Sequence, residues 1–476
     1  MARAAVIVGI MVVAFLGAGS AAFAVGQVTA EADSELGFAD FRAQTGLTGS
    51  GVTVAVFANL YYNYEAAQAS GDLPEVTFMY GAPVLQGNIG TRVIEIIHDI
   101  APGAAIQIYD MINVKDVDSM LPGSWDGNAK IAVFTDNFEQ NVWLDDDTEY
   151  ANTISQIISQ GSLVITSAGG HRLSYYLGTF KNAGNDLHDF GSGNTVWTVE
   201  TTETCDVGAS INWTDNYESY DYQNYGLYLL DKDMNVLSAN DCCNGGPRTW
   251  AGVSSAPAGT YHFSVWKDPA AEVRDFGLVL APCEVSDDAE NGYPTLISAG
   301  RTANTIGGIA AIPGVLAVAA LDRTVTTPHP AGRGQLFGVR ETSAEGPARV
   351  LMSDPIERIT PHVSATDCQS TYTAPGHQCG SWASAAVVAG AAALLQEHYQ
   401  LARPSDLQDI LSYSAADITS TGIGYDFRTG YGQINIWAAY RGENHVPTMA
   451  GPAGAGLACA LSVFIYWRRA RPLPYP

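Results

Sequence analysis

The sequence predicts an α/β protein whose doubly wound parallel sheet is interrupted by an inserted all-β sandwich domain. Short β-branched runs alternate with helically spaced apolar segments in residues 25–179 and again in residues 286–442, as in doubly wound folds. Residues 180–285 show no helical period and instead contain short alternating stretches between turns of Asn, Asp and Gly. At 476 residues and 47% hydrophobic composition, the chain can bury a large core.

Residues 1–24 are predicted to form a secretory signal peptide. Arg3 precedes an apolar run from Ala4 to Leu16, and the segment ends in the small-x-small pattern Ala22–Ala24. An uncleaved anchor is the alternative, which the short apolar run disfavours.

The first α/β part begins its sheet with the strand Gly51–Phe57, a β-branched run that follows a Ser-Gly turn. A helix with apolar residues at helical spacing follows at Thr91–Ile100, and Ala101–Gly103 ends it. The other expected elements are strands at 105–109, 131–134 and 163–167 and a helix at 150–160.

The central region is expected to form the sandwich, and the second α/β part then resumes the sheet. The sandwich strands are predicted at 196–200, 209–213, 225–230, 260–266 and 276–280. Gly314–Ala320 is strand-like, and Pro404–Ser414 is an amphipathic helix. The helix Ala383–Tyr399 is apolar on nearly every face, which predicts a buried position at the centre of the domain.

Residues 443–476 are predicted to be a transmembrane or sorting tail. Met449–Trp467 carries no charge and is long enough to span a bilayer, and Arg468, Arg469 and Arg471 follow it on the cytoplasmic side. With Val446–Thr448 before the span, the order resembles the C-terminal sorting signals of bacterial surface proteins. A plain anchor is the alternative. We therefore expect an exported protein, periplasmic or at the cell surface, held to the membrane by this tail.

The formal net charge of −26 disfavours nucleic acid and anionic lipid surfaces as partners. Such a surface can attract cations or basic partners, although a solvated acidic surface is the simpler interpretation. Asp145–Asp147 with Glu149 offers oxygen ligands for calcium, but consecutive carboxylates face one ion only in a bent loop, so a solvated loop is preferred. No other cofactor is expected.

The cysteines predict disulfide bonds, because an even number of them lies in the exported part of the chain. Cys368 and Cys379 enclose a short loop, and the remaining candidates lie in one region, where two bonds of open connectivity are expected. These remaining candidates are Cys205, Cys242, Cys243 and Cys283. The sequence has no Cys-x-x-Cys or His-x-x-x-His cluster, so no structural metal site is expected.

The order of these segments resembles the subtilisin-like (subtilase/sedolisin superfamily) serine peptidases over about Phe41–Arg172 and Gly308–Tyr440. Ile96–Ala104 is similar to the family's helix-to-strand turn, and Thr342–Pro347 resembles its Ser-Ser-x-Gly-Pro segment. Gly380–Gly390 aligns without a gap onto the motif that carries the nucleophile. Ala69–Pro74 resembles a bacterial branch in which an acidic residue can replace the usual histidine.

The resemblance implies a serine nucleophile, a base, an orienting acid and an oxyanion-stabilising asparagine. Other residues occupy the matching positions. They are Ala58 and Asn59 for the acid, Ile89 for the base, Gly170 for the asparagine and Trp382 for the nucleophile. None of these side chains can perform the corresponding step, so we expect no catalytic residue and a catalytically inactive pseudoprotease.

An active endopeptidase with a rearranged site is the alternative, with Ser381 as the fallback nucleophile. That residue lies one position too early and points about 100° away on the helix. The favoured hypothesis is a surface binding or structural protein whose ligand is an extracellular protein, peptide or glycan. A Tyr- and Asp-rich stretch is one candidate contact, although strand and turn residues of a sandwich are the preferred interpretation. The stretch comprises Tyr217, Tyr220, Asp221, Tyr222 and Tyr225.

Overall fold

The computed structural model describes residues 26–443, with gaps in that range. The gaps are residues 82–86, 112–122, 136–148, 217–220, 244–245, 282, 284–294, 297–303, 329–334, 353–355, 377–378 and 419–423. The predicted signal peptide, the predicted tail apart from its first residue Glu443, and Asp145–Asp147 therefore lie outside the described residues. Within the described part, no helix is both long enough and apolar enough to cross a membrane.

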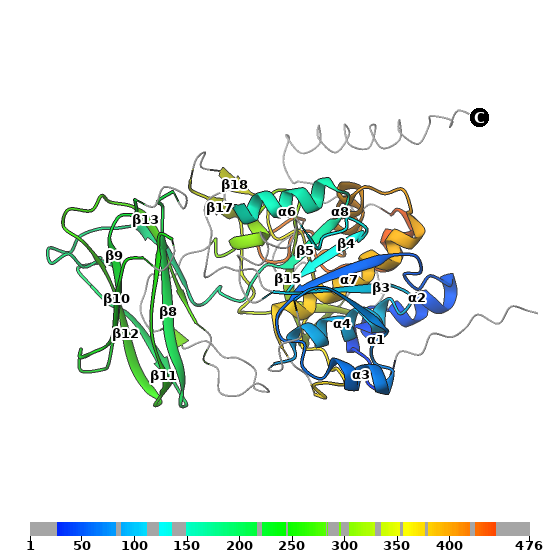
Figure 1. The fold of residues 1–476 in the computed structure, drawn as a ribbon, viewed down its shortest axis with the longest axis horizontal. Coiled ribbons are helices and arrows are strands. Elements are labelled where there is room, and N and C mark those ends of the chain that lie inside the picture. The colour runs from blue at the N-terminus through cyan, green and yellow to red at the C-terminus, as the bar shows by residue number, and fades with distance from the viewer. Residues whose placement is uncertain are drawn as a thin grey trace, which may run out of the picture.

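One lobe of the molecule is built around an eight-stranded sheet (Figure 1). Its strands are β1 Thr53–Ala58, β2 Val76–Tyr80, β3 Ala105–Asp110, β4 Ile131–Phe134, β5 Leu163–Ser167, β15 Leu316–Pro328, β16 Gln335–Val339 and β19 Val363–Thr366. The order is β16-β15-β5-β4-β1-β3-β2, and β19 also pairs with β15. Every pairing is parallel except that of β15 with β16, which is antiparallel.

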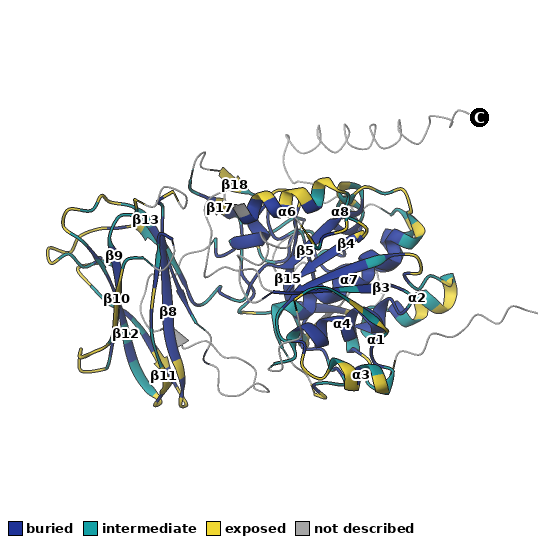
Figure 2. Cartoon of the chain, viewed as in Figure 1, coloured by how far each residue is buried: buried dark blue, intermediate teal, exposed yellow. Residues whose placement is uncertain are grey.

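Helices cover both faces of this sheet. Alternate residues of a strand point to opposite faces, so each strand contributes side chains to a core on either side. Val54 and Val56 of β1 join a core formed with α4 (Ile89–Ile100), α7 (Ser381–His398) and α8 (Pro404–Tyr413). Ala55 and Phe57 join a second core with α6 (Glu149–Ser159). The predicted parallel α/β architecture is confirmed, and the strands are buried between the two helical layers (Figure 2).

Helix α7 passes through the centre of the lobe, as its all-round apolar sequence predicts. Residues 383–396 are all buried. Its close crossing with α4 depends on Gly390, because a Cβ at this position would lie 2.7 Å from Cβ of Ile100.

Shorter elements surround this core. They are α1 Glu31–Glu35, α2 Phe38–Thr45, α3 Tyr64–Ser70, the 3₁₀ turn η1 Gly308–Ala311, β17 Ala348–Val350, β18 Ile356–Arg358 and α9 Ile436–Arg441. The sequence analysis did not identify α1, α2, α3 or α9, which are short and have little amphipathic pattern.

The second lobe contains two antiparallel sheets that share one hydrophobic core. Its strands are β6 Tyr175–Thr179, β7 Trp197–Thr201, β8 Cys205–Trp213, β9 Tyr225–Leu230, β10 Val236–Asp241, β11 Arg248–Ala256, β12 Gly259–Lys267, β13 Asp275–Leu280 and β14 Thr295–Leu296. The sheet orders are β10-β9-β12-β7-β14 and β11-β8-β13-β6. The sequence predicts that this lobe begins at residue 180. It begins earlier in the structure, because β6 pairs with β13.

The described cysteines pair as three disulfides. Cys368 bonds to Cys379, as the short loop predicts. Cys205 bonds to Cys283, and Cys242 bonds to its neighbour Cys243, so both bonds expected in the central region form inside the all-β lobe.

Candidate functional site

The positions expected to carry catalysis lie at the ends of the elements that hold them. Ala58 is the last residue of β1 and Asn59 follows it, Ile89 is the first residue of α4, and Gly170 follows β5 closely. Strands β1, β4 and β5 are neighbours and run parallel, so Ala58 and Gly170 lie toward the same edge of the sheet. Trp382 is the second residue of α7.

The amino ends of α4 and α7 are brought together around Trp382. The guanidinium carbon of Arg92, in α4, lies 4.4 Å from the centroid of the Trp382 ring. Arg92 is only 4% exposed, and Trp382 is half-buried against the main core. The side-chain amide of Asn88 also donates to the carbonyl of Thr373, in the segment that precedes α7, at 3.2 Å. The position at which the sequence resemblance places the nucleophile thus holds an indole that stacks on a buried arginine.

The backbone before Trp382 is fitted closely to its ring. A Cβ at Gly380 would overlap the indole nitrogen of Trp382. The N–H of Gly380 donates to the carboxylate of Asp367 at 2.7 Å, and this carboxylate also forms an ion pair with Arg340 at 3.3 Å. Burial raises the pKa of Asp367, while the charge of Arg340 opposes the rise. Asp367 thus holds the start of α7 in place. The sequence did not indicate this role, because Asp367 lies outside the aligned motifs.

Buried polar residues of α4 hold neighbouring segments against the helix. Asp99 accepts a hydrogen bond from the N–H of Ala30 at 2.7 Å, and Glu95 accepts one from the N–H of Thr373 at 3.4 Å. Burial raises the pKa of Glu95 to about 7 and raises that of Asp99 well above its ordinary value. The sequence analysis did not single out Glu95, because its helical pattern gave no reason to expect a buried acid.

Among the described residues, the substitute catalytic groups do not assemble at the α7 terminus. Ser381 is half-buried in the first position of α7, and Ser384 is completely buried. His98 lies in the last turn of α4, nine residues and therefore about 14 Å along the axis from Ile89.

One serine and one histidine do meet near the end of β5. His171 Nδ1 lies 3.3 Å from Ser174 Oγ. Burial lowers the pKa of His171 to about 4, and Ser174 is completely buried, so substrate does not reach this hydroxyl.

The expected contact stretch in the central region is mostly core or undescribed. Tyr217 and Tyr220 lie outside the described residues. Tyr225 is fully buried and stacks on Trp213 at 5.3 Å, so it is an inward-facing strand residue, as the preferred interpretation of the stretch predicts, and not a ligand contact. Tyr222 is half-buried against the same core.

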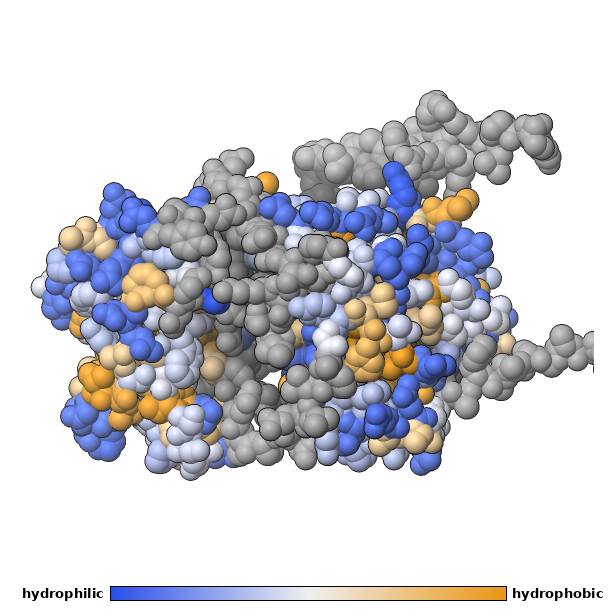
Figure 3. Space-filling model, in the orientation of Figure 1, coloured by the Kyte–Doolittle hydropathy of each residue, from blue (hydrophilic) through white to orange (hydrophobic). Residues whose placement is uncertain are grey.

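The all-β lobe does expose apolar side chains on β10 and β11. The exposed fractions are 58% for Val236, 42% for Leu237 and 47% for Trp250. Figure 3 shows a hydrophobic area on the lower part of this lobe, among mostly hydrophilic residues.

Comparisons with known proteins identify a fold but no family. No family model matches the chain, and no curated protein matches it. The structure of the CspB protease of Clostridium perfringens aligns with a TM-score of 0.50 at 12% identity, covering 84% of this chain and 94% of the other. MycP1 from Mycobacterium smegmatis aligns with a TM-score of 0.39 at 13% identity, covering 88% and 85%. The first of these alignments, at a TM-score of 0.50, supports the subtilisin-like fold that the sequence resemblance implies.

Proposed function

We propose that this protein is a pseudoprotease: a subtilisin-fold protein that binds a partner or supports a surface structure without hydrolysing peptides. The observation that carries the proposal is Trp382. Its indole occupies the position where the fold's nucleophile belongs, it has no oxygen that could attack an amide, and it is held by the buried guanidinium of Arg92 at 4.4 Å.

The other aligned positions support the same proposal. Ala58 cannot orient a base and Ile89 cannot accept a proton. Gly170 has no side chain to stabilise an oxyanion. Loss of the nucleophile or the base alone costs about 10⁶-fold in the rate of a comparable enzyme. If one of these positions were misaligned, the substitutions at the other positions would still support an inactive protein.

A fluorophosphonate probe tests the proposal directly. We expect no labelling of the purified full-length chain and no casein cleavage, beside an active subtilisin-type peptidase as the positive control. Labelling that disappears in the Ser381→Ala variant would contradict the proposal and favour the rearranged endopeptidase. The Ser384→Ala variant serves as the matched control, because this neighbouring serine of α7 is completely buried.

We further propose that the protein is exported and tethered by its tail. The signal-like residues 1–24 and the apolar segment Met449–Trp467 with its following arginines support this location. Truncation after residue 448 should move the protein from the membrane fraction to the soluble fraction. Retention of the truncated chain in the membrane would contradict the tether.

Calcium binding at Asp145–Asp147 and Glu149 remains a secondary proposal that rests on the sequence alone. It predicts a calcium-dependent rise in melting temperature that is lost in the Asp146→Ala variant. An equal rise in both proteins would place the effect elsewhere.

A further inference from the structure

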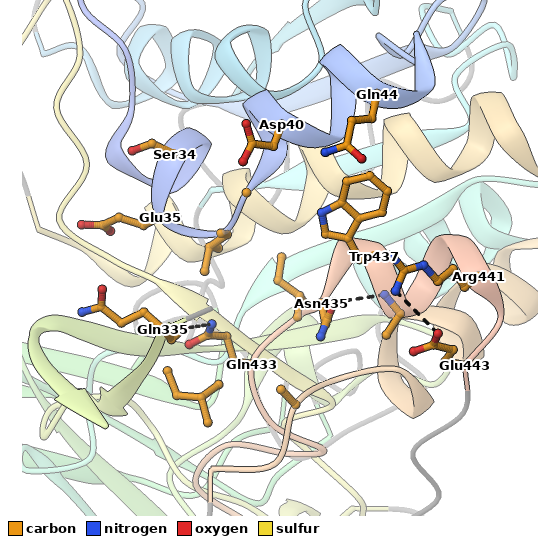
Figure 4. A pocket seen from close by; sticks show the side chains of 16 residues that line it. Ser34, Glu35, Asp40, Gln44, Gln335, Gln433, Asn435, Trp437, Arg441 and Glu443 are labelled. Carbon is orange, nitrogen blue, oxygen red and sulfur yellow. Dashed lines mark hydrogen bonds and ion pairs between the residues drawn. The ribbon is translucent and has the colours of Figure 1, made fainter. Parts of the chain in front are cut away.

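A pocket of about 910 Å³ lies in the α/β lobe between α1, α2, β16 and α9 (Figure 4). This volume is in the range of small-molecule binding sites. None of the expected catalytic positions lines the pocket, so it is distinct from the site around Trp382.

The lining offers hydrogen-bond donors and acceptors that the protein leaves unused. Asp40 and Gln44 extend from α2 toward Asn435 and Trp437 on the opposite side (Figure 4). Among the described residues, neither the Asp40 carboxylate, the Gln44 amide nor the Trp437 indole nitrogen makes a hydrogen bond or ion pair. Asn435 uses its side-chain oxygen to accept from the N–H of Ala438 at 3.0 Å, which leaves its amide hydrogens to donate.

Trp437 is held in a fixed orientation beside this polar lining. Its ring makes an edge contact with Phe41 at 5.1 Å, and the Arg441 guanidinium lies over it at 5.2 Å. Arg441 in turn lies 3.6 Å from Glu443. An aromatic ring that is already ordered contacts a ligand at little cost in conformational entropy.

The pocket is not arranged to add a peptide strand to the sheet. Strand β16 has β15 on one side, and Gln433 covers backbone groups on the other. The Gln433 side chain accepts from the N–H of Phe337 at 3.0 Å and donates to the carbonyl of Gln335 at 2.8 Å. An incoming peptide that pairs as an extra strand needs these same backbone groups.

The charges of the lining disfavour an anionic ligand. Glu35 is paired with Arg323 at 2.7 Å, whereas Asp40 has no basic partner among the described residues. The rest of the lining combines neutral donors and acceptors with apolar side chains beside the Trp437 ring, and its other two charges, on Arg441 and Glu443, lie 3.6 Å apart. Hydroxyl groups both donate and accept, so a polyhydroxylated ligand satisfies such a mixture.

We propose that this pocket binds a neutral oligosaccharide, with Trp437, Gln44, Asp40 and Asn435 as its contacts. The proposal is independent of whether the protein is a peptidase, because it uses none of the residues around Trp382.

The test is titration of the full-length protein, in a sugar-free detergent, with cellohexaose, chitohexaose, maltohexaose and xylohexaose. Calorimetry and saturation-transfer NMR report binding, and we expect a dissociation constant of about 1 mM or below for at least one of them. The Gln44→Ala and Asp40→Asn variants change exposed side chains and should each weaken binding by about fivefold or more. The Gln400→Ala variant, an exposed glutamine outside the pocket, is the matched control.

The Trp437→Phe variant adds a second measurement, since it keeps a ring against Phe41 but removes the indole N–H. Weaker binding with an unchanged melting temperature would support the proposal. No binding of any of the four oligosaccharides would overturn it, as would binding that is unchanged in both the Gln44→Ala and Asp40→Asn variants. Binding of tetralysine instead of the oligosaccharides would assign the pocket to a basic peptide and would also overturn the proposal.

Discussion

Two tryptophans of the α/β lobe lie beside an arginine, but in opposite surroundings. Arg92 is 4% exposed and stacks on Trp382 at 4.4 Å, at the position that we propose corresponds to the nucleophile. Arg441 is exposed and lies over Trp437 at 5.2 Å, at the border of an open pocket. The same pair of residue types therefore fills one site and borders the other. We expect the arginine–tryptophan interaction to be stronger at Trp382, because a desolvated cation interacts more strongly with an aromatic ring.

The largest expected effect concerns the buried acid one turn after Arg92. Burial raises the pKa of Glu95 from 4.5 to about 7, so the folded state holds a proton that the unfolded state releases. The contribution of Glu95 to the free energy of unfolding should be fully present below pH 4.5 and decline as the pH rises toward 7. The decline should amount to about 3 kcal/mol, given 1.36 kcal/mol per pKa unit. Denaturant unfolding of the wild type and of Glu95→Gln between pH 4 and pH 8 measures it.

The Glu95→Gln variant should lose this part of the pH dependence and gain stability relative to the wild type at pH 8. Glu65→Gln, which changes an exposed carboxylate of α3, is the matched control. Identical profiles for Glu95→Gln and the wild type would show that Glu95 is ionised in the folded protein.

Removal of the half-buried Trp382 indole is expected to have the next largest effect. Trp382→Ala deletes a half-buried ring and leaves the Arg92 guanidinium buried without it, which should lower the free energy of unfolding by about 2–3 kcal/mol. Chemical denaturation measures the loss. Trp382→Ser should be destabilised to a similar extent and should remain inactive, because Ala58, Ile89 and Gly170 are unchanged. Peptidase activity in the Trp382→Ser variant would show that only the nucleophile had been lost.

A smaller effect is expected when the buried arginine loses its charge but keeps an apolar side chain. Arg92→Met should cost about 1–2 kcal/mol, because the cation–ring contact is desolvated. The double variant Arg92→Met with Trp382→Ala should be less destabilised than the sum of the two single variants, since the lost interaction is shared. Additive losses would mean that the stacking contributes nothing measurable.

The sequence singled out Trp382 but contained no signal for the Trp437 pocket. Trp382 could be placed because it lies in an ungapped motif on a helix whose apolar residues predict burial. The pocket brings together residues near 34–44, 335 and 433–443, which are far apart in the sequence and lie on short helices or at a sheet edge. Their proximity results from tertiary packing, which the hydrophobic period of single segments does not report.

The all-β lobe shows the same limit for individual side chains. Alternating residues predicted its strands, but the face of each residue depends on which strands pair. Tyr225 belongs to a stretch that was considered as a ligand contact, and it packs against Trp213. Trp250, on the neighbouring sheet, was not singled out and is 47% exposed. The pattern identified strands, while pairing decided which aromatic residues reach the surface.

The smallest expected effect on stability belongs to the exposed member of the comparison. Arg441→Met should change the free energy of unfolding by no more than about 0.5 kcal/mol, because both its pairing with Glu443 and its contact with Trp437 are open to solvent. The matched pair of variants, Arg92→Met and Arg441→Met, makes the same chemical change beside the two tryptophans, and denaturation under one set of conditions compares them. Equal losses in the two variants would show that burial of the arginine does not distinguish the sites. A loss confined to Arg92→Met would show that the tryptophan at the α7 terminus is structural, whereas the one beside the pocket remains available to a ligand.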